Sequence, residues 1–168
     1  TNAVSGAGAS NVGLAGALGV NAVDMSTAAR LAQGASFIGI DGSGAVSLQA
    51  LGNTASTVSA KPAESTTGDK VGIGASAAVN VVANRTAADI VAGASLKDAG
   101  NVGLDASGQY STSTTAEAGA EGGIALTPAS ATAIVSNHPS ARIGSDLEIT
   151  GNLNVRAQQQ SASTTTAK

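Results

Sequence analysis

The sequence has no cysteine and no tryptophan, and its 168 residues include one phenylalanine, Phe37, and one tyrosine, Tyr110. Without cysteine the chain forms neither a disulfide framework nor a thiolate metal site. An aromatic side chain buries roughly 150 to 250 Å², so a chain nearly without them lacks the material of an ordinary globular core. Its hydrophobic residues, 42% of the chain, are mostly small, and 22 glycines accompany them. Such side chains touch only across a narrow space, as inside a solenoid coil.

Charge is also scarce, since only 11% of the residues are charged and the net charge is −3. Disordered chains combine low hydrophobicity with high net charge, whereas the mean hydropathy here is +0.17. The acidic balance offers no basic surface for nucleic acid or anionic lipid. The uncharged stretch 3–23 is interrupted by Gly, Ser and Asn, so we expect strands and turns there and no membrane insertion.

Internal repeats are the strongest signal in the sequence. The segment that begins at Gly13 aligns with the segment that begins at Gly72, at a constant offset of 72 − 13 = 59 residues. Asn21 then meets Asn80, and the triplet Gly-Ala-Ser at 34–36 meets its copy at 93–95. A third, more diverged copy matches the second at an offset of 53. We predict repeats at residues 12–62, 71–119 and 122–168, with residues 1–11 as the tail of a preceding repeat.

Each repeat shows the alternation of apolar and polar residues that is typical of half-buried strands. Val46, Leu48 and Ala50 alternate with polar residues, and Leu153 and Val155 do the same in the third copy. The Ala-rich segment 28–35 is the best helical candidate, but its counterparts contain Val, Ile and Gly. We therefore predict an all-β chain.

Gly and Asn mark the predicted corners, because both accept positive φ at little cost. The segments 41–44, 99–101 and 150–152 are predicted turns before a closing strand. Short strands with such corners predict a parallel β-helix with coils of about 20 residues, two to three coils per repeat. Pro128 and His138-Pro139 predict a loop or an irregular coil in the third copy.

The pattern in residues 71–106, with its G-A-x-x-A-V-N-V-V core and its later G-N-V-x-L-x-A strand, resembles the repeats of large Gram-negative exoproteins. These are filamentous-haemagglutinin-like and leukotoxin-like proteins, which include autotransporter adhesin passengers. The resemblance extends over nearly the whole chain. It implies a right-handed parallel β-helix, export by a type V route and display at the outer cell surface. It implies no ligand.

Motifs that suggest chemistry have simpler interpretations. Residues 72–77 fit the G-x-G-x-x-A dinucleotide fingerprint, which requires a helix to follow, but the segment continues as the alternating run AVNVV. A similar run recurs in the first copy, so we interpret these residues as a Gly-rich corner and strand. Asp41 lies in a predicted turn without other carboxylates. His138 is the sole histidine, and Asn84-Arg85-Thr86, a glycosylation sequon, is interpreted as a corner. We predict no catalytic, cofactor-binding or metal-binding residues, and no cofactor.

Two further patterns concern the surface. Arg30, Asp89 and Arg142 occupy equivalent positions, which predicts a sparse charged stripe worth about 0 to 1 kcal/mol per pair. The Ser/Thr-rich tails at 53–60, 107–118 and 158–167 predict rows of hydroxyl groups on flat strands.

The chain begins at Thr1 without a signal-peptide pattern, which is typical of a piece of a longer protein. We expect a non-enzymatic structural or adhesive stalk segment of a large secreted or surface-displayed bacterial adhesin or exoprotein, located outside the cell. The alternative is a binding module whose Ser/Thr-rich face contacts glycans or another surface. Expected partners are a host or neighbouring-cell surface, or self-association along the sides and ends of the solenoid. An enzyme would need clustered acids or bases, and the charges here are thinly spread.

Overall fold

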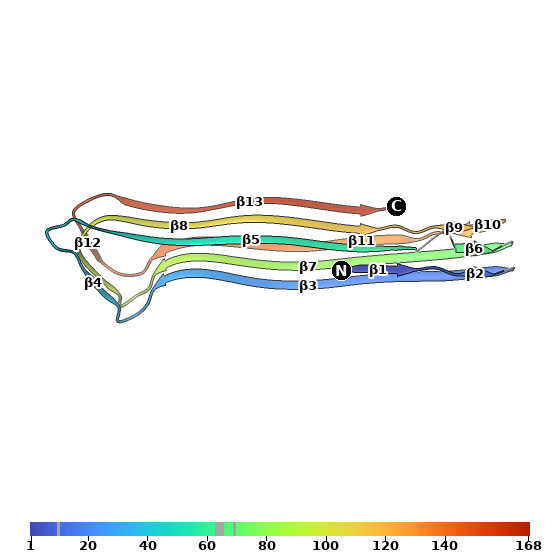
Figure 1. Ribbon diagram of the computed structural model, residues 1–168, viewed down its shortest axis with the longest axis horizontal. Coiled ribbons are helices and arrows are strands. Elements are labelled where there is room, and N and C mark those ends of the chain that lie inside the picture. The colour runs from blue at the N-terminus through green and yellow to red at the C-terminus, as the bar shows by residue number, and fades with distance from the viewer. Residues whose placement is uncertain (10, 63–65, 69) are drawn as a thin grey trace.

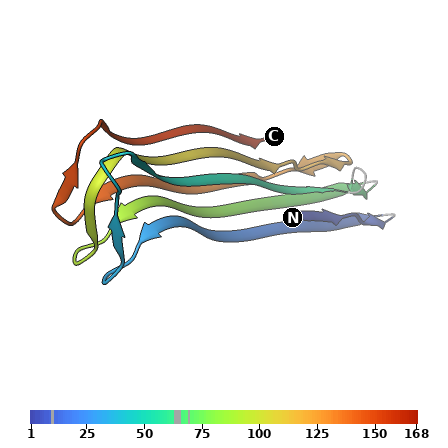
Figure 2. The ribbon, with the colours of Figure 1, turned by 60° about the vertical axis from the view of Figure 1, so that its left-hand side comes forward.

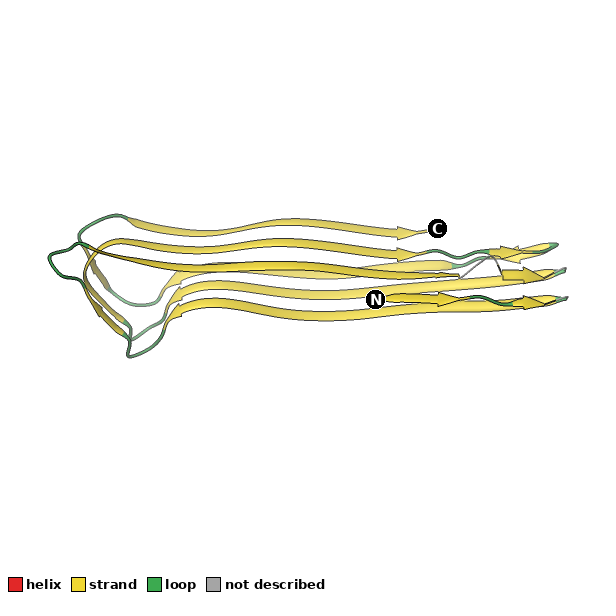
Figure 3. Cartoon of the chain, in the orientation of Figure 1, coloured by secondary structure: helices red, strands yellow, loops and turns green. Residues whose placement is uncertain are grey.

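The computed structural model describes residues 1–9, 11–62, 66–68 and 70–168, and these residues form strands and turns with no helix (Figures 1 and 3). Residue 10 of the predicted N-terminal tail lies outside them. The six long strands are β3 (Val12–Leu31), β5 (Gly44–Pro62), β7 (Val71–Ile90), β8 (Ser95–Ala116), β11 (Ala129–Ile143) and β13 (Leu153–Ala167). The short strands are β1 (Asn2–Ser5), β2 (Gly8–Ala9), β4 (Ser36–Ile38), β6 (Thr66–Gly68), β9 (Ala120–Glu121), β10 (Ile124–Leu126) and β12 (Leu147–Ile149).

The strands form three parallel sheets. Sheet A contains β1, β5, β8 and β13, with β4 and β12 along the start of β8. Sheet C contains β3, β7, β11 and β10, and the small sheet B contains β2, β6 and β9. The long strands of sheets A and C lie in two layers (Figure 2), which the segments with β4 and β12 join at one end and sheet B joins at the other. This all-β arrangement of stacked parallel strands is compatible with a β-solenoid.

The register between strands follows the repeat offsets. Asn21 on β3 pairs with Asn80 on β7, 59 residues later. Asn84 on β7 pairs with Asn137 on β11, 53 residues later. The predicted alignment of the copies is therefore confirmed at these strands, and equivalent side chains lie directly above one another.

The predicted coil of about 20 residues is wrong. A single strand such as β3 is already 20 residues long, and the chain returns to the same sheet only after 59 residues. One repeat thus makes one turn with two long strands. Gly and Asn had indicated corners, but residues 72–77 and the sequon at Asn84 both lie inside β7. The even-numbered residues of both segments face a narrow interior, where small side chains fit and no turn occurs, and the odd-numbered residues face outward.

Gly74 on β7 lies against Gly119, in the segment that joins β8 to β9. A Cβ built on Gly74 would lie 2.1 Å from the backbone oxygen of Gly119. No real Cβ approaches an oxygen so closely, so the two segments meet only because Gly74 has no side chain. In this strand glycine therefore provides a close backbone contact and not a turn.

One set of corners lies at the end of the slab near β4 and β12. Gly34 and Gly93, at equivalent positions after β3 and β7, have φ of 79° and 81°, which favours glycine. Residues 41–43 form a turn as predicted. Residues 99–101 do not form a turn, because β8 continues through them. Gly44 of β5 pairs with Ala99 of β8, and Val46 pairs with Val102, so β8 has one extra residue there, as in a β-bulge.

The irregular coil predicted at His138-Pro139 is also wrong, whereas residues 127–128 do interrupt the strands. The amide of Ser76 donates to the carbonyl of Pro128, and the amide of Gly144 donates to that of Ile90. Even-numbered residues of β11 therefore bond to β7, and the odd-numbered Pro139 lies on the other edge of β11. Its missing N–H costs no bond to β7.

The interior has two apolar clusters at its ends. One surrounds Ile90, Leu96 and Leu104 near β4 and β12. The other contains Val58 with alanines such as Ala78 and Ala116. All these side chains are nearly fully buried.

Between the clusters the interior is polar, and amides and hydroxyls link the two sheets. Ser56 Oγ donates to Asn80 Oδ1 at 2.8 Å, and Asn21 Nδ2 donates to Ser56 Oγ at 2.9 Å. Thr54 Oγ1 donates to Asn84 Oδ1 at 2.8 Å. Because buried polar groups must find partners, these bonds favour one register of sheet A against sheet C.

Side-chain amides also link neighbouring strands of sheet C. Asn84 Nδ2 donates to Asn137 Oδ1 at 2.7 Å, and Asn21 Nδ2 approaches Asn80 Oδ1 at 3.3 Å. Tyr110, the one tyrosine, is buried there, with its hydroxyl 2.7 Å from Thr86 Oγ1.

Replacing Gly74 by Ala should destabilise the fold by about 1 to 3 kcal/mol, because the new methyl group would overlap the Gly119 backbone. The matched control is Gly103→Ala, since a Cβ at Gly103 meets no atom within 4 Å. The measurement is the urea midpoint of each variant. Equal midpoints would show that the backbone around Gly119 moves away from Gly74 easily.

Replacing Asn84 by Ala should cost about 1 to 3 kcal/mol, because Thr54 and Asn137 would both lose a buried partner. Asn53→Ala, on the exposed side of β5, should stay within about 0.5 kcal/mol of the parent. Denaturation followed by circular dichroism measures both. A tolerated Asn84→Ala would mean that the polar centre contributes nothing to stability.

Candidate interaction surfaces

The outer surfaces of the two large sheets differ in chemistry. Side chains alternate between the interior and the outside along every long strand. We call the outward side chains of β5, β8 and β13 the hydroxyl face. Three of its rows, each running across the three strands, are Asn53-Gln109-Gln160, Thr57-Ser113-Thr164 and Ser59-Thr115-Thr166.

Only alternate residues of the Ser/Thr-rich tails reach this face. Thr57 and Ser113 lie outside, whereas Thr54, Thr112 and Thr114 are almost completely buried. The predicted hydroxyl rows are therefore present, but half of the predicted hydroxyl groups belong to the interior.

The outward face of sheet C is apolar over half its length. We define the apolar face as the outward side chains of residues 12–22 of β3, 71–81 of β7 and 124–134 of β10 and β11. Val12, Leu14, Leu18 and Val20 on β3 are 55 to 67% exposed. Ile124, Leu126 and Ile134 are similarly exposed at the other edge.

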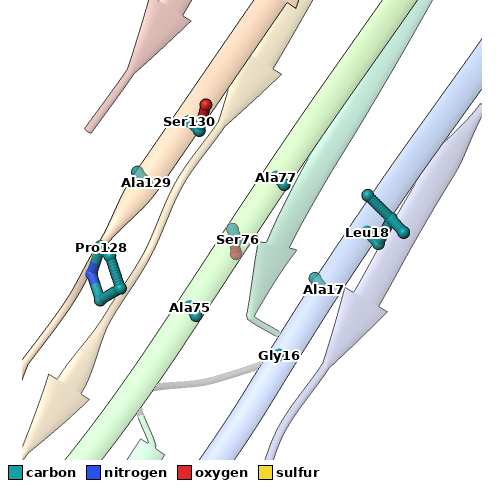
Figure 4. Close-up of a pocket in the computed structure, with 9 residues that line it drawn as sticks. All are labelled: Gly16, Ala17, Leu18, Ala75, Ser76, Ala77, Pro128, Ala129 and Ser130. Carbon is teal, nitrogen blue, oxygen red and sulfur yellow. The ribbon is translucent and has the colours of Figure 1, made fainter.

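A shallow depression lies in the middle of the apolar face (Figure 4). Gly16, Ala75 and Ala77 line it with small residues, and Pro128 lines it on the β11 side. The larger Leu18 stands beside Gly16 on β3. The face thus presents a projecting side chain next to a hollow.

The other half of the same surface is charged. Arg30 Nε lies 3.2 Å from Asp89 Oδ2, and Arg85 Nη1 lies 3.0 Å from Asp24 Oδ1. Arg142 aligns with Asp89 in the register, so the predicted charged stripe is present. Exposed ion pairs of this kind contribute about 0 to 1 kcal/mol each.

The residues that the sequence analysis considered for chemistry are dispersed. His138 has its ring Nε2 2.7 Å from Ser136 Oγ on exposed strand β11. Asp41 has a φ of 55° in its turn, where Ser43 Oγ donates to the carbonyl of Ile40. In the part of the chain that the structure describes, no three His, Asp or Glu side chains gather where they could hold a metal ion. Within the same residues we find no helix with the length and hydrophobicity that a membrane crossing needs.

The apolar face was missed by the sequence analysis, although a signal for it exists. In residues 12–20 and 71–79 both alternate sets are apolar or small, a pattern typical of strands covered on both faces. We had interpreted these stretches only as strands and turns.

Comparison of the chain with models of known protein families, with curated proteins and with solved structures finds no match.

Proposed function

We propose that the chain is a stalk segment of a large secreted or surface-displayed bacterial protein, an adhesin or exoprotein, and that its repeats are coils of a right-handed parallel β-solenoid. The observation that carries the proposal is the in-register stacking of equivalent strands, such as β3 on β7 and β7 on β11. Connections between parallel strands of one sheet are right-handed in almost all proteins, which supports the handedness. The proposed role is mechanical and involves no catalysis.

A stalk must be stiff and extendable. Each coil contributes about 15 to 20 residues of parallel pairing on each of two faces, so bending the stack would break many hydrogen bonds at once. Because equivalent residues face each other, further coils add to the stack without a new fold. The resemblance of the repeats to exoprotein repeats supports an extracellular, cell-surface location and type V export, with a host or neighbouring-cell surface as the partner.

The register also shows how coils could continue beyond this segment. Ala3 pairs with Ala60, Ala60 pairs with Ala116, and Ala116 pairs with Ala167. Ala167 is therefore equivalent to Ala3, three turns later. A chain in which Ala167 is followed by Val4 of another copy keeps the register.

Tandem chains joined from Ala167 to Val4 should form rods of constant width that lengthen by about 14 Å per copy, because three coils each rise about 4.8 Å. A strand of 20 residues such as β3 is itself about 66 Å long, so the stack becomes the longest dimension only beyond about five copies. Small-angle X-ray scattering of eight, twelve and sixteen copies therefore measures the maximum dimension and the cross-section. A maximum dimension that grows as in a flexible string of separate domains would refute the stalk.

The matched control joins Ala167 to Ser5, which removes one residue. A slip of one residue turns every following side chain to the opposite face of the sheet. The small interior residues would then point outward at the junction, and we expect these tandem chains to lose the linear increase in length.

A second candidate is a binding module, favoured by the rows of hydroxyl and amide groups on the hydroxyl face. If this face binds a glycan or an ice surface, a glycan array or an ice-recrystallisation assay should give a signal that falls at least tenfold in Ser113→Val with Thr164→Val. The control is Val81→Thr on the opposite outer face. Blank results in both assays would dispose of this function.

A further inference from the structure

The apolar face has the properties of an interface. Leu14 and Leu18 on β3 are 67% and 66% exposed, and their neighbours on β7, Ile73 and Ala77, are apolar as well. No charged residue belongs to the face. Contiguous exposed apolar surface of this kind marks interaction sites in soluble proteins. The hydroxyl face, built from the same repeats, shows that a solvated outer face in this chain is polar.

The relief of the face is complementary to itself. Leu18 projects beside the depression that Gly16 and Ala75 line (Figure 4). Consider a second copy placed face to face with the first, with its strands running in the opposite direction. If the two-fold axis runs across the strands along the row of Ala17 and Ser76, each Leu18 lies over the Gly16 of the other copy. In the same arrangement each Leu14 lies over a Val20. One surface then supplies both halves of an isologous contact.

We propose that the apolar face is a dimer interface, at which a second copy of this chain packs sheet C against sheet C with the strands antiparallel and the stacking directions the same. Two stalks that pack in this way project in one direction. The proposal follows from the surface and does not require the stalk role.

The area suffices for association. Three strands about 4.8 Å apart and 11 residues long, at about 3.3 Å per residue, cover roughly 500 Å² on each copy. Two copies together bury about 1,000 Å², the lower limit for a specific interface. Each further coil with the same outward residues would add to the contact.

The charged half of sheet C fits the same arrangement. With the axis at the row of Ala17, residues such as Asp24 and Arg30 extend beyond the start of the partner's strand β3 at Val12. The ion pairs of Arg30 with Asp89 and of Arg85 with Asp24 therefore stay hydrated. No charge is buried against the partner's apolar side chains, which would be costly.

Sedimentation velocity of the full chain over a concentration series tests the proposal. We expect a monomer–dimer equilibrium that weakens at least tenfold in Leu18→Lys. The matched control is Leu51→Lys, at an equally exposed leucine on the hydroxyl face, 68% exposed. Circular dichroism of each variant checks that the β-structure is retained. A monomer at all concentrations, or equal weakening by both substitutions, would overturn the proposal.

Cysteine cross-linking tests the geometry, because the chain has no cysteine of its own. A mixture of Gly16→Cys and Leu18→Cys chains should form a disulfide-linked heterodimer far faster than either variant alone. A Cβ at Gly16 has only an ordinary contact, 3.8 Å from the Ala75 oxygen, so the variant should fold. The control pair is Asn53→Cys with Ala55→Cys on the hydroxyl face. Preferential homodimers of Leu18→Cys would refute antiparallel packing, because parallel strands would place Leu18 against Leu18.

Vesicles of zwitterionic lipid test whether the apolar face contacts a lipid surface and not a second copy of the chain. We expect no co-sedimentation of the chain with them, and binding that Leu18→Lys abolishes would overturn the dimer in favour of a lipid surface. The outcome is separable from the stalk proposal, since tandem chains could lengthen linearly whether or not this face dimerises.

Discussion

The close approach of the two large sheets is the constraint on which the rest of the structure depends. At Gly52 on β5 the facing strand β7 is so close that a single methyl group would overlap the hydroxyl of Thr86. Toward the middle of the slab the gap admits Ala, Ser, Thr, Asn or Val, and the single tyrosine lies beside Gly52 and Gly108, where added side chains would collide with its ring or hydroxyl. Larger Ile and Leu side chains pack in the cluster near β4 and β12. A thin core of this kind buries little per residue, so its stability accumulates along long strands and from coil to coil. This explains why the chain has so few aromatic residues.

The polar centre of the interior complements that constraint. Small apolar residues pack similarly in many registers, and by themselves they specify pairing poorly. Asn80 and Asn84 favour the observed alignment, because their amide oxygens accept hydrogen bonds from Ser56 and Thr54 across the gap. The same amides reach Asn21 and Asn137 in the neighbouring coils. A buried amide thus aligns the two sheets and the stack at once, as buried Asn residues fix register in coiled coils.

Several features were predictable because they are properties of the repeat. The offsets of 59 and 53 residues determine which strands pair, and alternation determines that strands form. Coil length was not predictable from Gly and Asn. Both residues favour turns locally, yet Gly74 and Asn84 lie within β7, where a close backbone contact and a buried hydrogen bond decide their place. Pro139 is tolerated for a related reason, since its position in the pairing leaves its nitrogen on the edge away from β7.

By itself the sequence determined the all-β class, the register between repeats and the absence of an aromatic core, because these depend on composition and on spacing along the chain. Along a strand such as β3 both alternating sets of residues are small or apolar, and only the tertiary structure decided which set faces inward. Gly13, for example, is buried and Leu14 is exposed. That choice depends on the distance between sheets that are far apart in sequence. It buries half of the hydroxyl groups of the Ser/Thr tails and exposes Leu14 and Leu18, and it thereby creates the two outer faces through which this protein can meet a partner.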